Sequence, residues 1–145
     1  MKKLLPLLAL ALAGGGLHAA PQKIAAHEPL RPVADCPRIN EINEWYIVDG
    51  RHAVVRTGPK HFLVTMQGAC PRLGLGPSGL LFRASNSNLA VGENRICGEP
   101  GETVRSRNQP PCALQSVRAI DKDEFVRLSR KAMRHGSGAD QPTRP

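Results

Sequence analysis

The sequence predicts an α+β fold: a mostly antiparallel β-sheet, either a meander or a small open barrel, with one C-terminal helix and two disulfides. Three observations predict it. Short β-branched runs alternate with turn-forming pairs between residues 45 and 66. An even number of cysteines, four, is typical of a disulfide framework. An amphipathic segment with a capping residue begins at Asp121 and predicts the helix.

The first nineteen residues have the layout of a secretory signal peptide. Lys2 and Lys3 precede an apolar run, and Leu17-His18-Ala19 predicts cleavage after Ala19. The run is too short to span a hydrocarbon core of about 30 Å, which needs about 20 apolar residues. We therefore expect a periplasmic or secreted protein that is not transmembrane once the signal is removed.

The rest of the chain divides into three parts. Residues 20–34 contain Pro21, Pro29 and Pro32 without apolar periodicity, which predicts a flexible lead-in. Residues 35–135 carry all four cysteines and all the periodic segments, and we expect a single disulfide-bonded, β-rich domain there. Residues 136–145 are polar and predict a disordered tail.

The cysteines are expected to form structural disulfides, because an exported domain folds in an oxidising compartment. They show no C-x-x-C spacing and have no histidine within five residues, which argues against a zinc site and a thioredoxin-like site. Four cysteines allow three connectivities. We favour Cys36–Cys70 with Cys97–Cys112, because each bridge then closes a short, turn-rich segment.

The spacing of Ile39 and Ile42 predicts a helical turn as the first element of the domain. Three strands are then predicted at residues 45–49, 52–57 and 61–66, separated by Asp49-Gly50 and Gly58-Pro59. If the second turn is at Gly58-Pro59, the residues that lie opposite each other in the two strands form one apolar face. The residues of that face are Ala53, Val55, Phe62 and Val64. The other face carries His52, Val54, Arg56, His61, Leu63 and Thr65.

Later elements are a loop at residues 68–79, a polar turn at 85–88, and the helix. Short strands are expected at residues 80–84, 89–91, 95–97, 103–105 and 113–120. Asp121 caps the helix with Glu124 as its capping-box partner, Asp123 pairs with Arg127, and Gly136 ends the helix. Its apolar side holds Phe125, Val126, Leu128, Ala132 and Met133.

The opposite side of this helix is the best candidate binding surface. Its basic residues are Arg127, Arg130, Lys131 and Arg134, and Arg105, Arg107 and Arg118 are expected to extend it. Arginine suits bidentate contact with carboxylate or phosphate, and the net charge of +8 favours anionic partners. An acidic envelope protein or anionic lipid headgroups are the expected partners. The alternative is the solvated side of a packed helix.

Several other patterns point to chemistry but have simpler explanations. Gly74-x-Gly76-x-x-Gly79 matches the dinucleotide fingerprint formally, yet Pro77 interrupts it and a strand follows, which favours a loop. His52, His61 and Arg56 share a face, either as an anion-binding patch or as a solvated face. Ser78 and Ser85 lie outside any G-x-S-x-G elbow. We predict no catalytic, cofactor-binding or metal-ligating residue, and no cofactor.

Nucleic acid is not an expected partner. Only 3% of the residues are aromatic, whereas single-stranded sites stack bases on aromatic faces. The few rings that the chain has are needed for the core.

Two stretches resemble a known family. Residues 36–73 (CPRINEINEWYIVDGRHAVVRTGPKHFLVTMQGACPRL) and the later Asn94-Arg95-Ile96-Cys97 are similar to a family of small uncharacterised proteobacterial secreted proteins, a domain of unknown function. In that family a cysteine precedes a Trp-bearing strand, and a hairpin leads to Gly-x-Cys. The resemblance implies a periplasmic address and a disulfide-bonded β-rich domain, and it transfers no activity.

Three functions remain open from the sequence. The first is a non-catalytic binding or accessory module that docks an anionic envelope partner through the basic surface. The second is a proteinaceous inhibitor of a secreted hydrolase, acting through a bridged loop such as Gly98 to Pro111. The third is an enzyme of unrecognised type.

Overall fold

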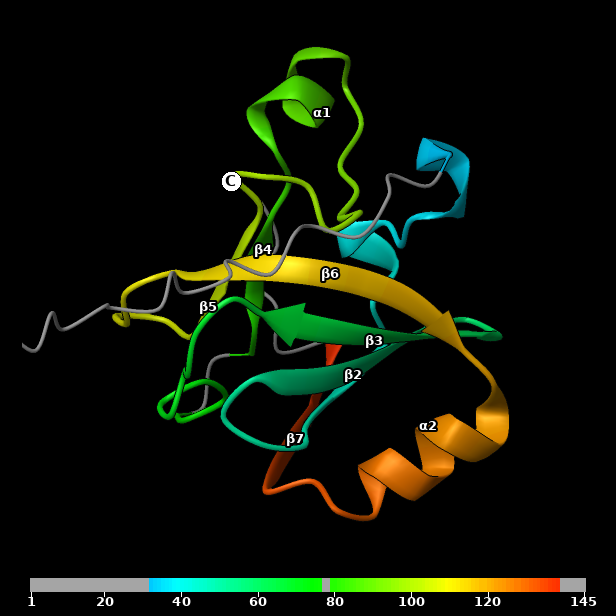
Figure 1. Cartoon of the computed structure of the whole chain (residues 1–145), viewed down its shortest axis with the longest axis vertical. Helices are drawn as coiled ribbons and strands as arrows, with labels where there is room; N and C mark the ends of the chain where they lie inside the picture. Colours follow the sequence, from blue (N-terminus) through cyan, green and yellow to red (C-terminus); the bar gives the residue numbers. More distant parts are fainter. Residues whose placement is uncertain (1–31, 77–78, 139–145) are drawn as a thin grey trace, which may run out of the picture.

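The fold is a curved antiparallel sheet with one main helix. The computed structural model describes residues 32–76 and 79–138, so the expected signal peptide, most of the lead-in and the end of the tail lie outside the described residues. Seven strands form one sheet in the order β4-β5-β6-β3-β2-β1-β7 (Figure 1). With two disulfides, this confirms the predicted fold class.

The element bounds follow the chain in this order. The strands are β1 (Glu44–Ile47), β2 (His52–Thr57), β3 (Lys60–Met66), β4 (Leu81–Arg83), β5 (Thr103–Arg105), β6 (Cys112–Ile120) and β7 (Arg134–Ser137). The helices are α1 (Asn86–Ala90) and α2 (Lys122–Ser129), preceded by single 3₁₀ turns at Val33–Asp35 and Ile39–Glu41.

The β2–β3 hairpin has the register expected from its turn. Thr57 lies opposite Lys60, Val55 opposite Phe62, and Arg56 opposite His61. Side chains alternate along each strand, so this register places the predicted apolar face on one side of the sheet and the Val54–Leu63 pair on the other. The side with Trp45 and Val55 is called the inner face below, and the side that α2 covers is the outer face.

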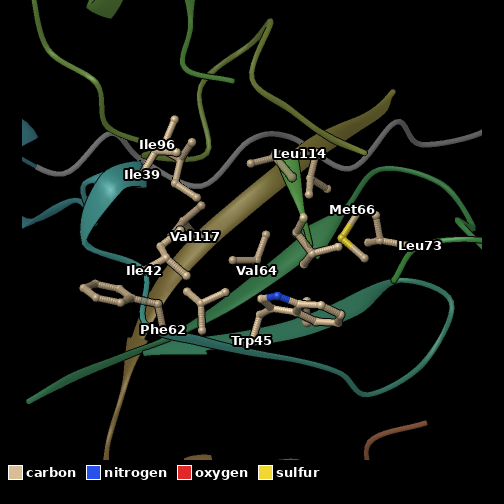
Figure 2. Close-up of a cluster of buried hydrophobic side chains, with 14 of the residues drawn as sticks. Ile39, Ile42, Trp45, Phe62, Val64, Met66, Leu73, Ile96, Leu114 and Val117 are labelled. Carbon is tan, nitrogen blue, oxygen red and sulfur yellow. The ribbon is translucent and has the colours of Figure 1, made fainter. Parts of the chain in front are cut away.

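The main core lies on the inner face. Strand residues such as Val64 and Met66 meet residues from the loops, including Ile39, Leu73 and Ile96 (Figure 2). Burying one such aliphatic or aromatic side chain contributes about 1.5–3 kcal/mol. A smaller cluster on the outer face joins Val54 and Ile120 to Phe125 of α2.

Trp45 is enclosed by two glycines. A side chain at Gly136, its cross-strand neighbour in β7, would collide with the indole ring, and one at Gly74 would lie 3.0 Å from it. Gly74 also has a φ of +74°, which favours glycine. The backbone of the 68–76 loop and of β7 can therefore lie directly on the ring.

Gly136→Ala is expected to lower the free energy of unfolding by about 1–3 kcal/mol, because the new methyl group has no space beside the indole. Gly68→Ala is the matched control, since a Cβ there meets nothing within 4 Å. Urea unfolding followed by Trp45 fluorescence measures both. Equal stability of the two variants would contradict this packing.

The C-terminal segment differs from the expectation. The helix ends at Ser129, and Arg134–Ser137 form β7 against β1. The Met133 N–H then bonds the Ile47 carbonyl, which begins the pairing. The open edge of β1 therefore overrides local helix propensity, and Gly136 and Ser137 belong to the sheet although the sequence assigned them to the tail.

Two shorter expectations were also wrong. Residues 86–90 form α1 instead of a turn and a strand, because the Ser85 hydroxyl accepts the Asn88 N–H and caps a helix. The expected strand at residues 95–97 is reduced to one isolated bridge, between Arg38 and Arg95. By contrast, the strands expected near β4, β5 and β6 are confirmed.

The disulfide connectivity differs as well. Cys36 bonds Cys97 and Cys70 bonds Cys112, so the expected Cys36–Cys70 and Cys97–Cys112 pairs are wrong. Backbone hydrogen bonds between residues far apart in the chain explain the true pairs. The Ile96 N–H bonds the Pro37 carbonyl, and the Gln67 N–H bonds the Ala113 carbonyl. Non-local pairing, which loop length does not reveal, brings the correct sulfurs together.

Candidate functional site

Three of the four predicted basic residues lie together at the end of α2. Arg127, Arg130 and Lys131 are exposed, because Phe125 is turned into the outer-face cluster and takes the opposite side of the helix. Arg127 keeps 60% of its side chain exposed and lies 3.9 Å from Glu124. We call these three residues the α2 basic surface. Cations at a helix C-terminus are favoured by the macrodipole.

Arg134 does not belong to this surface. It lies in β7 opposite Ile47, so its side chain is on the inner face. Its Nη1 donates to the carbonyls of Pro71 at 3.1 Å and Leu73 at 2.9 Å. These bonds hold the 68–76 loop against the sheet, and we assign Arg134 a structural role.

The expected extension of the patch is not formed. Arg118 donates to both oxygens of Glu124, at 3.2 and 2.8 Å, and its charge is compensated there. Arg105 lies in β5, with β6 and β3 between it and β2, so it is near the other end of the sheet from α2 (Figure 1). The α2 basic surface is therefore a separate, small patch.

The start of α2 explains why its acidic residues do not cancel this patch. Asp121 accepts the Glu124 N–H at 2.7 Å, which confirms the predicted cap. The hydrogen bond from Arg118 lowers the pKa of Glu124 below its ordinary value, with further lowering by the charges of Arg118 and Arg127. The expected Asp123–Arg127 pair is replaced by the contact of Arg127 with Glu124.

The histidine face is occupied by internal contacts. His52 and His61 share the outer face as predicted, and Arg56 lies opposite His61. However, Arg56 bonds both oxygens of Glu44, at 3.1 and 2.7 Å, and the His61 ring is 4.5 Å from that of Phe125. These partners compensate Arg56 and favour the solvated-face interpretation over an anion-binding patch.

His52 contacts a carboxylate that belongs to a turn. Its Nδ1 is 2.9 Å from both oxygens of Asp49, and Asp49 also accepts the N–H groups of Arg51 and His52. Burial raises the pKa of Asp49, but these backbone bonds and the His52 ring lower it more, so the net pKa is below its ordinary value. The pair closes the Asp49-Gly50 turn.

The glycine-rich loop lacks the setting of a dinucleotide site. The extended strand β4 follows it, where the fingerprint requires a helix. The Gly74 N–H donates to the Ser106 hydroxyl at 2.7 Å, which fixes the loop near Trp45. Pro77 and Ser78 lie outside the described residues.

One buried charged residue, Glu102, was not expected from the sequence. Its side chain is fully buried, and its carboxylate accepts the N–H groups of Cys97 at 2.8 and 2.9 Å and Gly98 at 2.7 Å. Burial raises the pKa of Glu102, while these N–H donors act in the opposite direction. The available signal was a pair of glutamates, Glu99 and Glu102, inside a Gly/Pro-rich segment without periodicity.

Comparison with known proteins gives one match. A sequence profile described as "Family of unknown function (DUF6491)" matches residues 1–136. Neither the curated proteins nor the solved structures show a significant match. Among the helices of the described residues, none has the length and apolar character needed to cross a membrane.

Proposed function

This chain belongs to the DUF6491 family of unknown function, and we propose that it is an exported, non-catalytic binding module that docks an acidic envelope partner. The docking site is the α2 basic surface. Two disulfides, with no free cysteine among the described residues, fit an oxidising compartment outside the cytoplasm.

The observation that carries the proposal is the uncompensated charge at the end of α2. Within the described residues, Arg130 and Lys131 have no carboxylate within 4.0 Å. Other arginines, such as Arg56 and Arg118, are matched by a glutamate across the sheet or along the chain. Unmatched, exposed arginine and lysine are suited to carboxylates of a partner protein.

The other two functions have less support. The inhibitor hypothesis relied on a loop closed by a Cys97–Cys112 bridge, and these cysteines have other partners. The segment between them contains β5 and the buried Glu102, so its middle part is built into the sheet. We do not propose an enzymatic role.

A triple reversal tests this function. Arg127→Glu with Arg130→Glu and Lys131→Glu is expected to weaken binding to an acidic partner about tenfold or more. Wild-type binding should also weaken steeply between about 0.1 and 1 M salt, because the Debye length falls from about 10 to 3 Å. The measurement is binding to poly-L-glutamate-coated beads and to proteins of a native envelope extract, at both salt concentrations.

The matched control carries the same change in net charge elsewhere. Lys60 at the start of β3 and Arg72 and Arg107 in two loops are exposed, and their reversal to Glu should leave binding nearly unchanged. Equal loss in the two triple variants would contradict a localised site. Binding to vesicles with 30% phosphatidylglycerol, but not to acidic protein, would replace the proposed partner by a lipid surface.

A further inference from the structure

The sheet ends at β4, whose outward side has no strand partner among the described residues. β4 is the first strand in the sheet order, and within the described residues it pairs with β5 alone. A terminal strand presents alternate N–H and C=O groups to its open side, and these groups form a template for another strand. β4 lies far from α2 in the sheet (Figure 1).

The open end of the sheet also carries a groove. It has a volume of about 450 Å³ and is lined by Leu81, Phe82, Arg83, Thr103, Arg105 and Pro111. Phe82 and Leu81 are half-buried, so the groove offers apolar surface beside the strand. Arg83 and Arg105 are exposed, so it also offers cations.

The two arginines lie on the same face. Leu81 is opposite Arg105 and Arg83 is opposite Thr103, and opposed residues of antiparallel strands share a face. Arg83 donates to the Asn86 side chain at 3.3 Å, and no other hydrogen bond of its guanidinium is formed within the described part of the chain. Among the described residues, neither the Arg83 nor the Arg105 side chain forms an ion pair, so both cations lack a carboxylate.

We propose that β4 is a docking edge for an extended peptide with acidic side chains at alternate positions. A peptide strand added to β4 would lie about 4.8 Å from it, with every second side chain on the arginine face. Arg83 then lies on the strand next to the peptide, and Arg105 lies one strand further away. An arginine and a glutamate side chain together are long enough to span either distance. The backbone ladder supplies affinity and the arginines select the charge.

This site is separate from the α2 basic surface. It uses backbone groups of a sheet edge, while the α2 basic surface offers side-chain charge alone. The two sites can therefore fail or succeed independently in experiments.

The test uses an eight-residue peptide of alternating Glu and Val, acetylated and amidated at its ends. Two further versions carry N-methyl groups on all Glu or on all Val, so that each blocks one edge of the peptide strand. We expect the unmodified peptide to bind with a Kd below about 1 mM. One N-methylated version should bind at least about tenfold more weakly and the other nearly as well, because only one edge faces β4.

Two variants with equal charge change complete the test. Arg83→Gln with Arg105→Gln should weaken peptide binding about tenfold, whereas Lys60→Gln with Arg72→Gln, exposed residues outside both proposed sites, should leave it nearly unchanged. Urea unfolding of each variant checks that the fold is intact. Absence of peptide binding, or equal binding of all three peptides, would overturn the proposal. If inorganic polyphosphate displaces both N-methylated peptides equally well, the result would also overturn the proposal. A site that binds any polyanion would then explain the binding.

Discussion

Cys36→Ser combined with Cys97→Ser is expected to lower the free energy of unfolding by about 4 kcal/mol. The bridge joins residues 61 positions apart, and a cross-link over such a loop restricts the unfolded chain strongly. Cys70→Ser with Cys112→Ser should cost a similar amount, about 4 kcal/mol, because the separation of 42 residues enters only through its logarithm. Urea unfolding under non-reducing conditions measures both.

A crossed pair of substitutions provides the decisive control. Cys36→Ser with Cys70→Ser also replaces two cysteines, but in this structure it breaks both bridges. We expect it to cost about twice as much as either matched pair and to leave two free thiols, which a thiol reagent titrates. If the crossed variant is instead the more stable one and has no free thiols, the connectivity is wrong.

Glu102→Ala is expected to cost about 3 kcal/mol or more. It removes the acceptor of the Cys97 and Gly98 N–H groups, and each buried, unsatisfied donor costs about 1–3 kcal/mol. The Gly98 backbone packs closely on that of Ser116, since a Cβ at Gly98 would lie 2.8 Å from the Ser116 Cα. The consequence extends to Cys97 and therefore to its bridge with Cys36.

Glu41→Ala is the comparison for this variant. Glu41 is 55% exposed and forms a surface ion pair with Arg38, a class of interaction worth about 0–1 kcal/mol. Thermal or urea unfolding of the two variants should therefore differ by several kcal/mol. Similar stabilities would show that Glu102 is not required for the turn.

Glu102 also predicts a pH dependence with a definite sign. Burial raises the pKa of Glu102 in the folded protein above its ordinary value of 4.5. The folded state then binds more protons than the unfolded state, so this group makes stability fall as pH rises from 4.5 through the folded pKa. Glu102→Gln should remove that fall. A wild-type profile that rises over this range relative to the Gln variant would contradict the sign.

Local pattern was sufficient for some parts of the fold. The β2–β3 hairpin followed from side-chain alternation and the Gly58-Pro59 turn, because register is set by which face must be buried. The start of α2 followed from the Asp121 cap, since capping depends on residues within one turn. Neither feature requires knowledge of distant segments.

The candidate site was predictable only in part. Helical spacing placed Arg127, Arg130 and Lys131 on one exposed side, as the structure shows. It also extended that side to Arg134, which lies in β7 and bonds the loop carbonyls. Whether a basic segment continues a helix or becomes a strand depended on the open edge of β1, which is distant in the chain.

The sequence by itself determined the short-range features of this protein: alternating strands, tight turns, a capped helix and the number of cysteines. Only the tertiary structure decided which sulfurs are bonded, where β7 begins, that Glu102 is buried, and that β4 ends the sheet. The physical reason is that periodicity and capping act over a few residues, whereas strand partners and burial depend on segments tens of residues apart.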